Sequence, residues 1–177
     1  GDAALEINVS DEFPAPHVGP EYSGIALGDD GEPVCVDTSM NMSSADVKKA
    51  LMELMPLIKE RLKYLTEAAE MVHFLFTEPA VPAADQIIPK KLDLAKTKEV
   101  LEASKDFVKA LPNLDHEGSE ALAREMAEKL GVKLGDFMMP IRMAVTGSRV
   151  SPPLMGSILI LGVERSLERI ERTLQTL

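Results

Sequence analysis

The sequence has few aromatic residues, a single cysteine and no long apolar run. Aromatic side chains make up 4% of its 177 residues and tryptophan is absent, whereas ten methionines are present. The core should therefore be aliphatic and rich in methionine, as helix packing tolerates. The lone Cys35 excludes an internal disulfide and a cysteine-based zinc site. No stretch approaches the roughly 18 apolar residues of a membrane span, and no signal-peptide pattern follows Gly1, which predicts a cytoplasmic protein without membrane contact.

Catalytic motifs are missing as well. The chain has no glycine-rich phosphate loop, and its three histidines are scattered at His17, His73 and His116. The acidic pairs Asp11-Glu12 and Asp29-Asp30 fall in polar turns, where solvation is favoured over general acid catalysis. For His73, which lies in an apolar helical pattern, a hydrogen-bonded structural role is favoured over a ligand role. We therefore expect no catalytic residue, cofactor or metal site in this chain.

Positive charge is absent from the first 46 residues. That segment contains ten acidic residues and neither Lys nor Arg, so it carries the whole formal net charge of −10. In the rest of the chain 19 basic residues balance the 19 remaining acidic ones, and basic residues outnumber acidic ones from Gly131 onward. A phosphate backbone interacts with the charge of the surface that it contacts, not with the net charge of the whole chain. The negative net charge therefore does not exclude RNA binding.

The fold predicted from the patterning is mainly all-α, an irregular multi-helix cage and not an up-and-down bundle. Residues 1–43 are rich in Gly, Pro and Asp and lack a helical period, so they are expected to be irregular with at most one hairpin. That hairpin would pair residues 25–27 with 34–36 around the turn-forming Gly28–Gly31. Strand signals nearly disappear after Met40.

Helix signals begin at Ser43, with Asp46 three residues further on as in a capping box. Apolar residues then recur on one face up to Pro56, which should end or kink this helix and begin another that runs to about Leu65. Thr66 is expected to cap the following helix. These helices form a first predicted subdomain.

A stretch with three prolines between residues 79 and 89 separates this subdomain from a second one. Asp93 and Asp115 are placed to cap the next two helices, and Gly131 suits the left-handed residue after the second. Three more helices are expected near residues 135–146, 153–161 and 163–176. The predicted boundaries are 1–43 for the acidic segment, 44–78 for the first helical subdomain, 79–92 for the linker and 93–177 for the second helical subdomain.

The last helix carries acidic and basic residues at a spacing of four. At this spacing opposite charges form weak surface pairs that support a helix. Such pairs are expected among Arg165, Arg169, Arg172, Glu164, Glu168 and Glu171.

The most informative stretch runs from residue 140 to 162 and has the sequence PIRMAVTGSRVSPPLMGSILILG. Arg142 and Arg149 flank a turn of small residues, and Ser151 and Pro152-Pro153 follow at the start of the next helix. Stiff backbone beside planar cationic side chains suits bases held out of a stack. Arg142 lies among apolar residues, so its guanidinium should either pair with a carboxylate or face a ligand.

Extended to Leu177, this stretch closely resembles the end of the anticodon-binding region of bacterial glutamyl-tRNA synthetases, a class I family. The family pattern is PLR-x-A-x-TG-S-x-x-(S/T)-P-x-L followed by LG-x-ER-x-x-x-RL. Residues matching it here are Pro140, Arg142, Ala144, Thr146, Gly147, Ser148, Ser151, Pro152, Leu154, Leu161, Gly162, Glu164, Arg165 and Arg169. The runs PLIKERLKYLTEAAEMVHFLFTE at 56–78 and GVKLGDF at 131–137 are similar to two further family blocks. The resemblance covers about residues 49–177 and fails before residue 44, where a typical member has helices.

The resemblance implies a monomeric, non-catalytic C-terminal domain that holds the anticodon loop of glutamate tRNA. Aminoacylation would then be carried out by a catalytic domain that uses ATP and is absent from this chain. An alternative of another class is a freestanding helical module for protein–protein interaction, whose acidic segment docks a partner.

Site residues implied by the resemblance lie in two of the similar blocks. The family's arginine at the position of Arg142 contacts anticodon bases. The counterpart of Arg61, where it is arginine, favours cytosine over uracil at the first anticodon position. Further tRNA-binding candidates are Ser151, Pro152 and Leu154, which match family positions that offer backbone and apolar contacts to flipped-out bases. Arg149 is a candidate phosphate contact, but when it is taken alone a solvated surface charge is the favoured interpretation.

Overall fold

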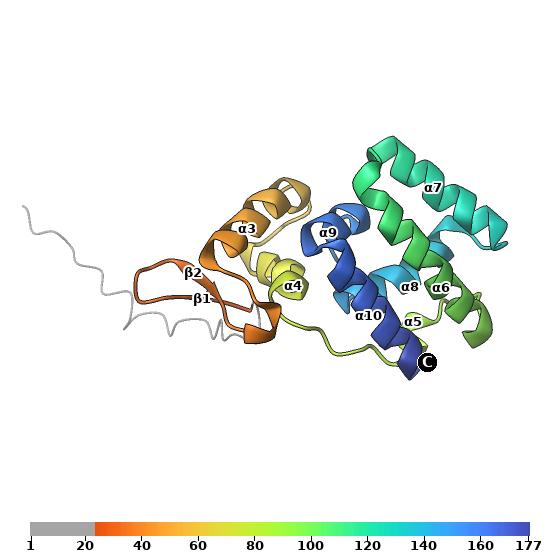
Figure 1. Cartoon of the computed structure of the whole chain (residues 1–177), viewed down its shortest axis with the longest axis horizontal. Helices are drawn as coiled ribbons and strands as arrows, with labels where there is room; N and C mark the ends of the chain where they lie inside the picture. The colour runs from red at the N-terminus through yellow and green to blue at the C-terminus, as the bar shows by residue number, and fades with distance from the viewer. Residues whose placement is uncertain (1–23) are drawn as a thin grey trace, which may run out of the picture.

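The computed structural model describes residues 24–177, which form a mainly helical fold with a short antiparallel hairpin. Eight α-helices lie in this described range (Figure 1). The elements are β1 (Ile25–Leu27), β2 (Pro33–Cys35), the 3-10 turn η1 (Thr38–Met40), α3 (Ser44–Ile58), α4 (Leu65–Phe76), α5 (Ala84–Ile87), α6 (Leu94–Ala110), the 3-10 turn η2 (Leu111–Asn113), α7 (His116–Lys129), α8 (Leu134–Thr146), α9 (Leu154–Leu161) and α10 (Val163–Thr176). The expected helical fold class is therefore confirmed. The expectation for residues 1–23 lies outside the described residues.

The hairpin occupies the predicted place, with a small shift in its second strand. β1 and β2 pair antiparallel, with Ile25 opposite Cys35 and Leu27 opposite Pro33. The second strand thus begins at Pro33, one residue before the expected start. The hairpin docks on the end of α4, because the Cys35 thiol donates a hydrogen bond to the Phe76 carbonyl oxygen at 3.1 Å.

Helix α3 begins as predicted and continues further than predicted. Ser43 and Asp46 form the expected reciprocal capping box. Pro56 does not end the helix at its own position, because the buried stripe that includes Leu54 continues to Ile58 and keeps the last turn packed. The expected second helix up to Leu65 is wrong, since the chain turns at residues 59–64.

The start of α4 also differs from the expectation. The helix begins at Leu65, so Thr66 lies inside its first turn and is not the cap. The carboxylate of Glu67 instead accepts hydrogen bonds from the backbone N–H groups of Lys63 at 2.9 Å and Tyr64 at 3.4 Å. A side chain three residues inside the helix therefore closes its N-terminus.

Caps in the second half of the chain agree with the sequence. The carboxylates of Asp93 and Asp115 accept the N–H groups of Lys96 and Gly118, each at 2.7 Å. Gly131 follows α7 with φ of +67°, as its place after the helix predicted. The region 79–92 contains the short helix α5, and the proposed subdomain boundaries stay a prediction.

Buried apolar residues form two clusters. One surrounds Leu54 and Phe76 between α3 and α4, and the larger one surrounds Phe107 and Phe137, whose rings meet edge to face with centroids 5.7 Å apart. Leu161 at the end of α9 packs against both clusters. Helices α9 and α10 lie between the α3–α4 pair and the α6–α7 pair (Figure 1), so they join the two parts of the fold.

The arginines of α10 do not form the expected surface pairs. All three converge on the carboxylate of Glu78, with nitrogen–oxygen distances of 3.8 Å from Arg165, 3.2 Å from Arg169 and 2.6 Å from Arg172. Arg169 is only 1% exposed and also donates to the backbone oxygens of Val145 at 2.7 Å and of Thr77 at 3.2 Å. The expectation of i, i+4 pairs for these arginines is therefore wrong: they link α4, α8 and α10.

Residues 24–177 contain neither a helix that could span a membrane nor a candidate metal site. None of the helices there combines the length and the apolar character needed to cross a bilayer. In the same range no three His, Cys, Asp or Glu side chains are grouped so that they could hold a metal ion.

Candidate nucleic-acid interface

The loop between α8 and α9 is fixed by its own hydrogen bonds. Gly147 ends α8 with φ of +69°, and a Cβ at this position would lie 2.9 Å from the Cβ of Pro79, so the close approach of the two segments requires glycine. The hydroxyl of Thr146 donates to the Arg142 carbonyl oxygen at 2.8 Å, and the hydroxyl of Ser148 donates to the Val150 carbonyl oxygen at 2.9 Å. Such a loop presents its side chains in defined positions.

Arg142 lies half-buried on α8 beneath this loop. Its Nη1 donates to the hydroxyl oxygen of Ser151 and, at 3.1 Å, to the carbonyl oxygen of Pro152. No carboxylate of residues 24–177 forms an ion pair with it. Burial, and secondarily the positive charge of Arg61, lower the pKa of Arg142. Of the two alternatives that the sequence left open, a carboxylate partner is not found among residues 24–177, and the contact with a ligand stays a prediction.

A groove of about 620 Å³ runs between α3, α7, α8 and α9. We call it the Arg142 groove, and its lining consists of Leu57, Arg61, Leu114, Asp115, His116, Ser119, Glu120, Met138, Arg142, Pro153, Leu154, Met155, Gly156 and Leu159. Guanidinium donors, carboxylate acceptors and apolar surface thus occur side by side. Such a mixture suits the edges and faces of nucleobases better than a bare phosphate.

Arg61 comes from the turn after α3 and reaches the same groove. Its side chain is exposed and makes no hydrogen bond or ion pair with any residue that the structure describes. Arg61 and Arg142 therefore line the same groove, and the positive charge of Arg61 acts on the guanidinium of Arg142. Like charges held together in this way favour an electron-rich ligand.

The other predicted site residues differ in how they contribute. Leu154 is only 3% exposed and forms part of the groove lining. Ser151 and Pro152 are buried, and both accept hydrogen bonds from Arg142, so they hold its guanidinium in place. Arg149 is exposed and does not line the groove; its Nη2 donates a hydrogen bond to the carbonyl oxygen of Gln86 at 3.3 Å. The structure thus brings five of the six predicted residues together around the groove.

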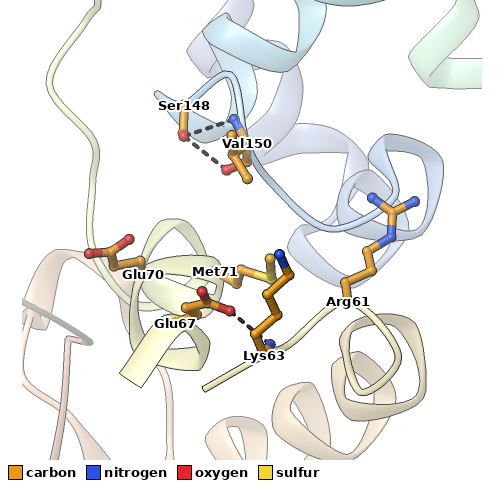
Figure 2. A pocket seen from close by; sticks show the side chains of 7 residues that line it. All are labelled: Arg61, Lys63, Glu67, Glu70, Met71, Ser148 and Val150. Atoms are coloured by element: carbon orange, nitrogen blue, oxygen red, sulfur yellow. Dashed lines mark hydrogen bonds between the residues drawn. The ribbon is translucent and has the colours of Figure 1, made fainter. Parts of the chain in front are cut away.

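A second hollow, of about 360 Å³, is also lined by Arg61 (Figure 2). We call it the α4 hollow, and its lining consists of Arg61, Lys63, Glu67, Glu70, Met71, Ser148 and Val150. The sequence analysis did not single out Lys63 and Glu70, which line this hollow. The only signal for Lys63 is its place two residues after Arg61 in the same turn, and nothing distinguishes Glu70 from other exposed acids of the chain.

Comparisons with known proteins show which family the chain resembles. The family described as "Anticodon binding domain" matches residues 32–174. The glutamate–tRNA ligase of Treponema denticola is 56% identical over 128 residues, which cover 72% of this chain and 25% of that ligase. The corresponding ligases of Treponema pallidum (strain Nichols) and Roseiflexus sp. (strain RS-1) are 46% and 42% identical, over 72% and 71% of this chain and 24% and 25% of their own lengths.

The chain spans about a quarter of the length of these curated relatives. The matched family covers most of the described residues, including both blocks that contribute to the Arg142 groove. The expectation that the resemblance fails before residue 44 is wrong for residues 32–43, which the family also matches. The resemblance found in the sequence is thereby confirmed: the chain belongs to the anticodon-binding domain family, in the form found in glutamate–tRNA ligases.

Proposed function

We propose that the Arg142 groove holds the anticodon loop of a glutamate tRNA. Arg142 contacts bases that have left the stack, and Arg61 contacts the edge of the first anticodon base. The observation that carries this proposal is the pair of guanidinium groups, one half-buried and one exposed, that lack a carboxylate partner among residues 24–177. A planar fork of donors is suited to base edges and to phosphates alike.

The remaining candidates have supporting roles in this proposal. Leu154 supplies apolar surface for a base, while Ser151 and Pro152 fix the orientation of Arg142. Arg149 contacts the RNA backbone with the donors that its bond to Gln86 leaves unused. Base contacts thus come from the groove, and phosphate contacts come from its margin.

The parent protein is inferred to be a complete glutamate–tRNA ligase that acts in the cytoplasm, where tRNA is charged. In such an enzyme a catalytic portion outside this chain uses ATP to activate glutamate, and the present domain binds no cofactor. Binding energy from the anticodon, far from the reacting groups, then contributes to selection of the correct tRNA. We infer that the domain acts as a monomer.

Titration of an anticodon stem-loop into this chain tests the proposal. We expect a dissociation constant of about 10 μM or weaker that rises with salt, because phosphate contacts release counterions. Arg142→Lys keeps the charge but loses the planar fork, so it should weaken binding by about 1–3 kcal/mol. Thermal unfolding of the same variant serves as the control for folding. Binding that does not respond to salt, or that Arg142→Lys leaves unchanged, would refute the proposal.

Two stem-loops that differ only in cytosine or uracil at the first anticodon base test the role of Arg61. Arg61→Gln should narrow the preference for cytosine by about 1–3 kcal/mol. Stability should change little, because the side chain is exposed and makes no bond to the described residues. If the variant keeps the full preference, Arg61 is only a surface residue of the turn.

A further inference from the structure

The Arg142 groove is formed by two parts of the fold that have separate apolar clusters. Leu57 and Arg61 come from α3 and the turn after it, whereas Arg142 comes from α8 and Gly156 comes from α9. Helix α9 lies beside α3, and the two helices are in contact (Figure 1). The space between Arg61 and Arg142 therefore depends on how closely α3 approaches α9.

Gly156 lies at the contact between α9 and α3. A Cβ at this position would lie 2.7 Å from Cδ1 and 3.7 Å from Cδ2 of Leu57. The shorter distance is well below the separation of about 3.5–4.0 Å at which two carbon atoms attract most strongly. The end of the Leu57 side chain thus occupies the space that a side chain at position 156 would need.

The backbone of α9 does not itself require glycine at this position. Gly156 lies inside the helix, and its φ is not positive, unlike that of Gly147 or Gly162. Glycine is a poorer helix former than alanine, because it loses more backbone freedom on folding. The missing side chain of Gly156 therefore weakens the helix locally but permits the close contact with Leu57.

Leu57 has little room to yield except toward the groove. Its side chain is half-buried, packs against the cluster around Leu54 and Phe76, and also lines the Arg142 groove. A Cβ at position 156 would push this side chain into the groove or move α3 away from α9, because packed interiors do not absorb added atoms. Either response changes the shape of the groove without altering Arg61 or Arg142.

We propose that the contact between Gly156 and Leu57 sets the width of the Arg142 groove and thereby the fit of the RNA loop. Both are positioning residues, since they act through the spacing of the two arginines. This inference rests on the proposed anticodon-binding function and adds two residues that the family motif does not single out. Fit then depends on a packing contact between α3 and α9 as well as on the charged groups.

The test is Gly156→Ala, titrated with an anticodon stem-loop of glutamate tRNA. Affinity should fall about tenfold, because one added methyl group at this contact displaces Leu57. Thermal stability should change little, because the displaced atoms are the flexible end of a side chain and alanine is the better helix former. A loss of binding without a loss of stability distinguishes a positioning role from a purely structural one.

Gly135→Ala is the matched control for this substitution. Gly135 lies in α8, the helix that carries Arg142, and its φ is not positive. A Cβ there would meet no atom of another part of the structure within 4 Å, and Gly135 does not line the groove. The same chemical change should therefore leave the affinity for the stem-loop unchanged.

A second substitution at Leu57 tests whether the contact itself is responsible. Leu57→Val shortens the side chain by one carbon and so makes room for the added methyl group. Combined with Gly156→Ala, it should restore most of the lost affinity, since residues in direct contact show such non-additive effects. Recovery of this kind is not expected when Leu57→Val is combined with Gly135→Ala.

The outcomes separate this inference from the proposed function. If the unmodified chain does not bind the stem-loop, the anticodon-binding proposal fails and the positioning role fails with it. If the unmodified chain binds and Gly156→Ala binds equally well, the function stands and the positioning role is refuted. A loss of affinity that Leu57→Val does not reverse would also refute it, because contact with Leu57 would then not be the cause.

Discussion

The convergence of three arginines on Glu78 predicts that this one carboxylate stabilises the whole domain. Arg169 has no exposed side-chain surface, and Glu78 is 27% exposed. Burial lowers the pKa of Arg169, whereas the charge of Glu78 raises it. Glu78→Gln keeps the size of the side chain and one acceptor oxygen but removes the only negative charge recorded in contact with these arginines among the described residues.

The magnitude follows from what remains after the substitution. Removing one partner of a buried ion pair typically destabilises a protein by about 3–5 kcal/mol. Arg169 would keep its bonds to the Val145 and Thr77 oxygens, and partial exposure of Glu78 weakens the electrostatic contribution. We therefore expect Glu78→Gln to lower the free energy of unfolding by about 2–3 kcal/mol, which for a chain of this size lowers Tm by about 4–12 °C.

Urea unfolding followed by circular dichroism, at low and high salt, measures this effect. The loss should persist at high salt, because a pair that includes a fully buried arginine is screened far less than a surface pair. Glu125→Gln is the control, since Glu125 pairs at 2.5 Å with Lys129 on the exposed face of α7 and should matter by less than about 1 kcal/mol. Equal effects of the two substitutions would refute the prediction that Glu78 stabilises the domain through the arginines of α10.

Two further predictions concern local features, and each compares a pair of substitutions. Gly147→Ala should destabilise more than Gly131→Ala, because both glycines have positive φ but only at Gly147 would the added Cβ meet Pro79; equal changes in Tm would contradict the close contact. Burial lowers the pKa of His73, so below pH of about 6.5 the unfolded chain takes up a proton that the folded chain resists, and stability should fall as the pH drops. Urea titrations between pH 7 and 5.5 measure this loss of stability, which His73→Gln should reduce. His116→Gln, at an exposed position, should leave the loss unchanged. Identical pH profiles for the two variants would contradict the role of His73.

Signals that act over a few residues were predictable from the sequence. The caps at Ser43, Asp93 and Asp115 and the left-handed Gly131 follow from hydrogen bonds within one helical turn. The end of α3 was predicted wrongly, because the burial of Ile58 against α4 outweighed the local effect of Pro56. A helix that loses one hydrogen bond to proline can still continue when its last turn is packed.

Long-range partners explain the remaining differences. The pattern of α10 suggested pairs within the helix, but the acid that Arg169 contacts is 91 residues away, and no local spacing reveals it. The same holds for the site. Arg61 and Arg142 could be proposed from the family resemblance. The grouping of Lys63 and Glu70 with Arg61 depends on how the turn after α3, helix α4 and the α8–α9 loop come together, which no local pattern reveals.

What distinguishes the arginines of this domain is the partner that each one has. Arg165, Arg169 and Arg172 direct their donors to a carboxylate and to backbone oxygens, so their charge is used within the fold. Arg142 is held by a hydroxyl and a carbonyl oxygen, which orient a guanidinium without neutralising it. Arg61 lines the same groove, and its side chain makes no hydrogen bond or ion pair with the described residues. Orientation without neutralisation leaves a positive charge in a defined place, and that is the condition under which a guanidinium can select a base by its edge.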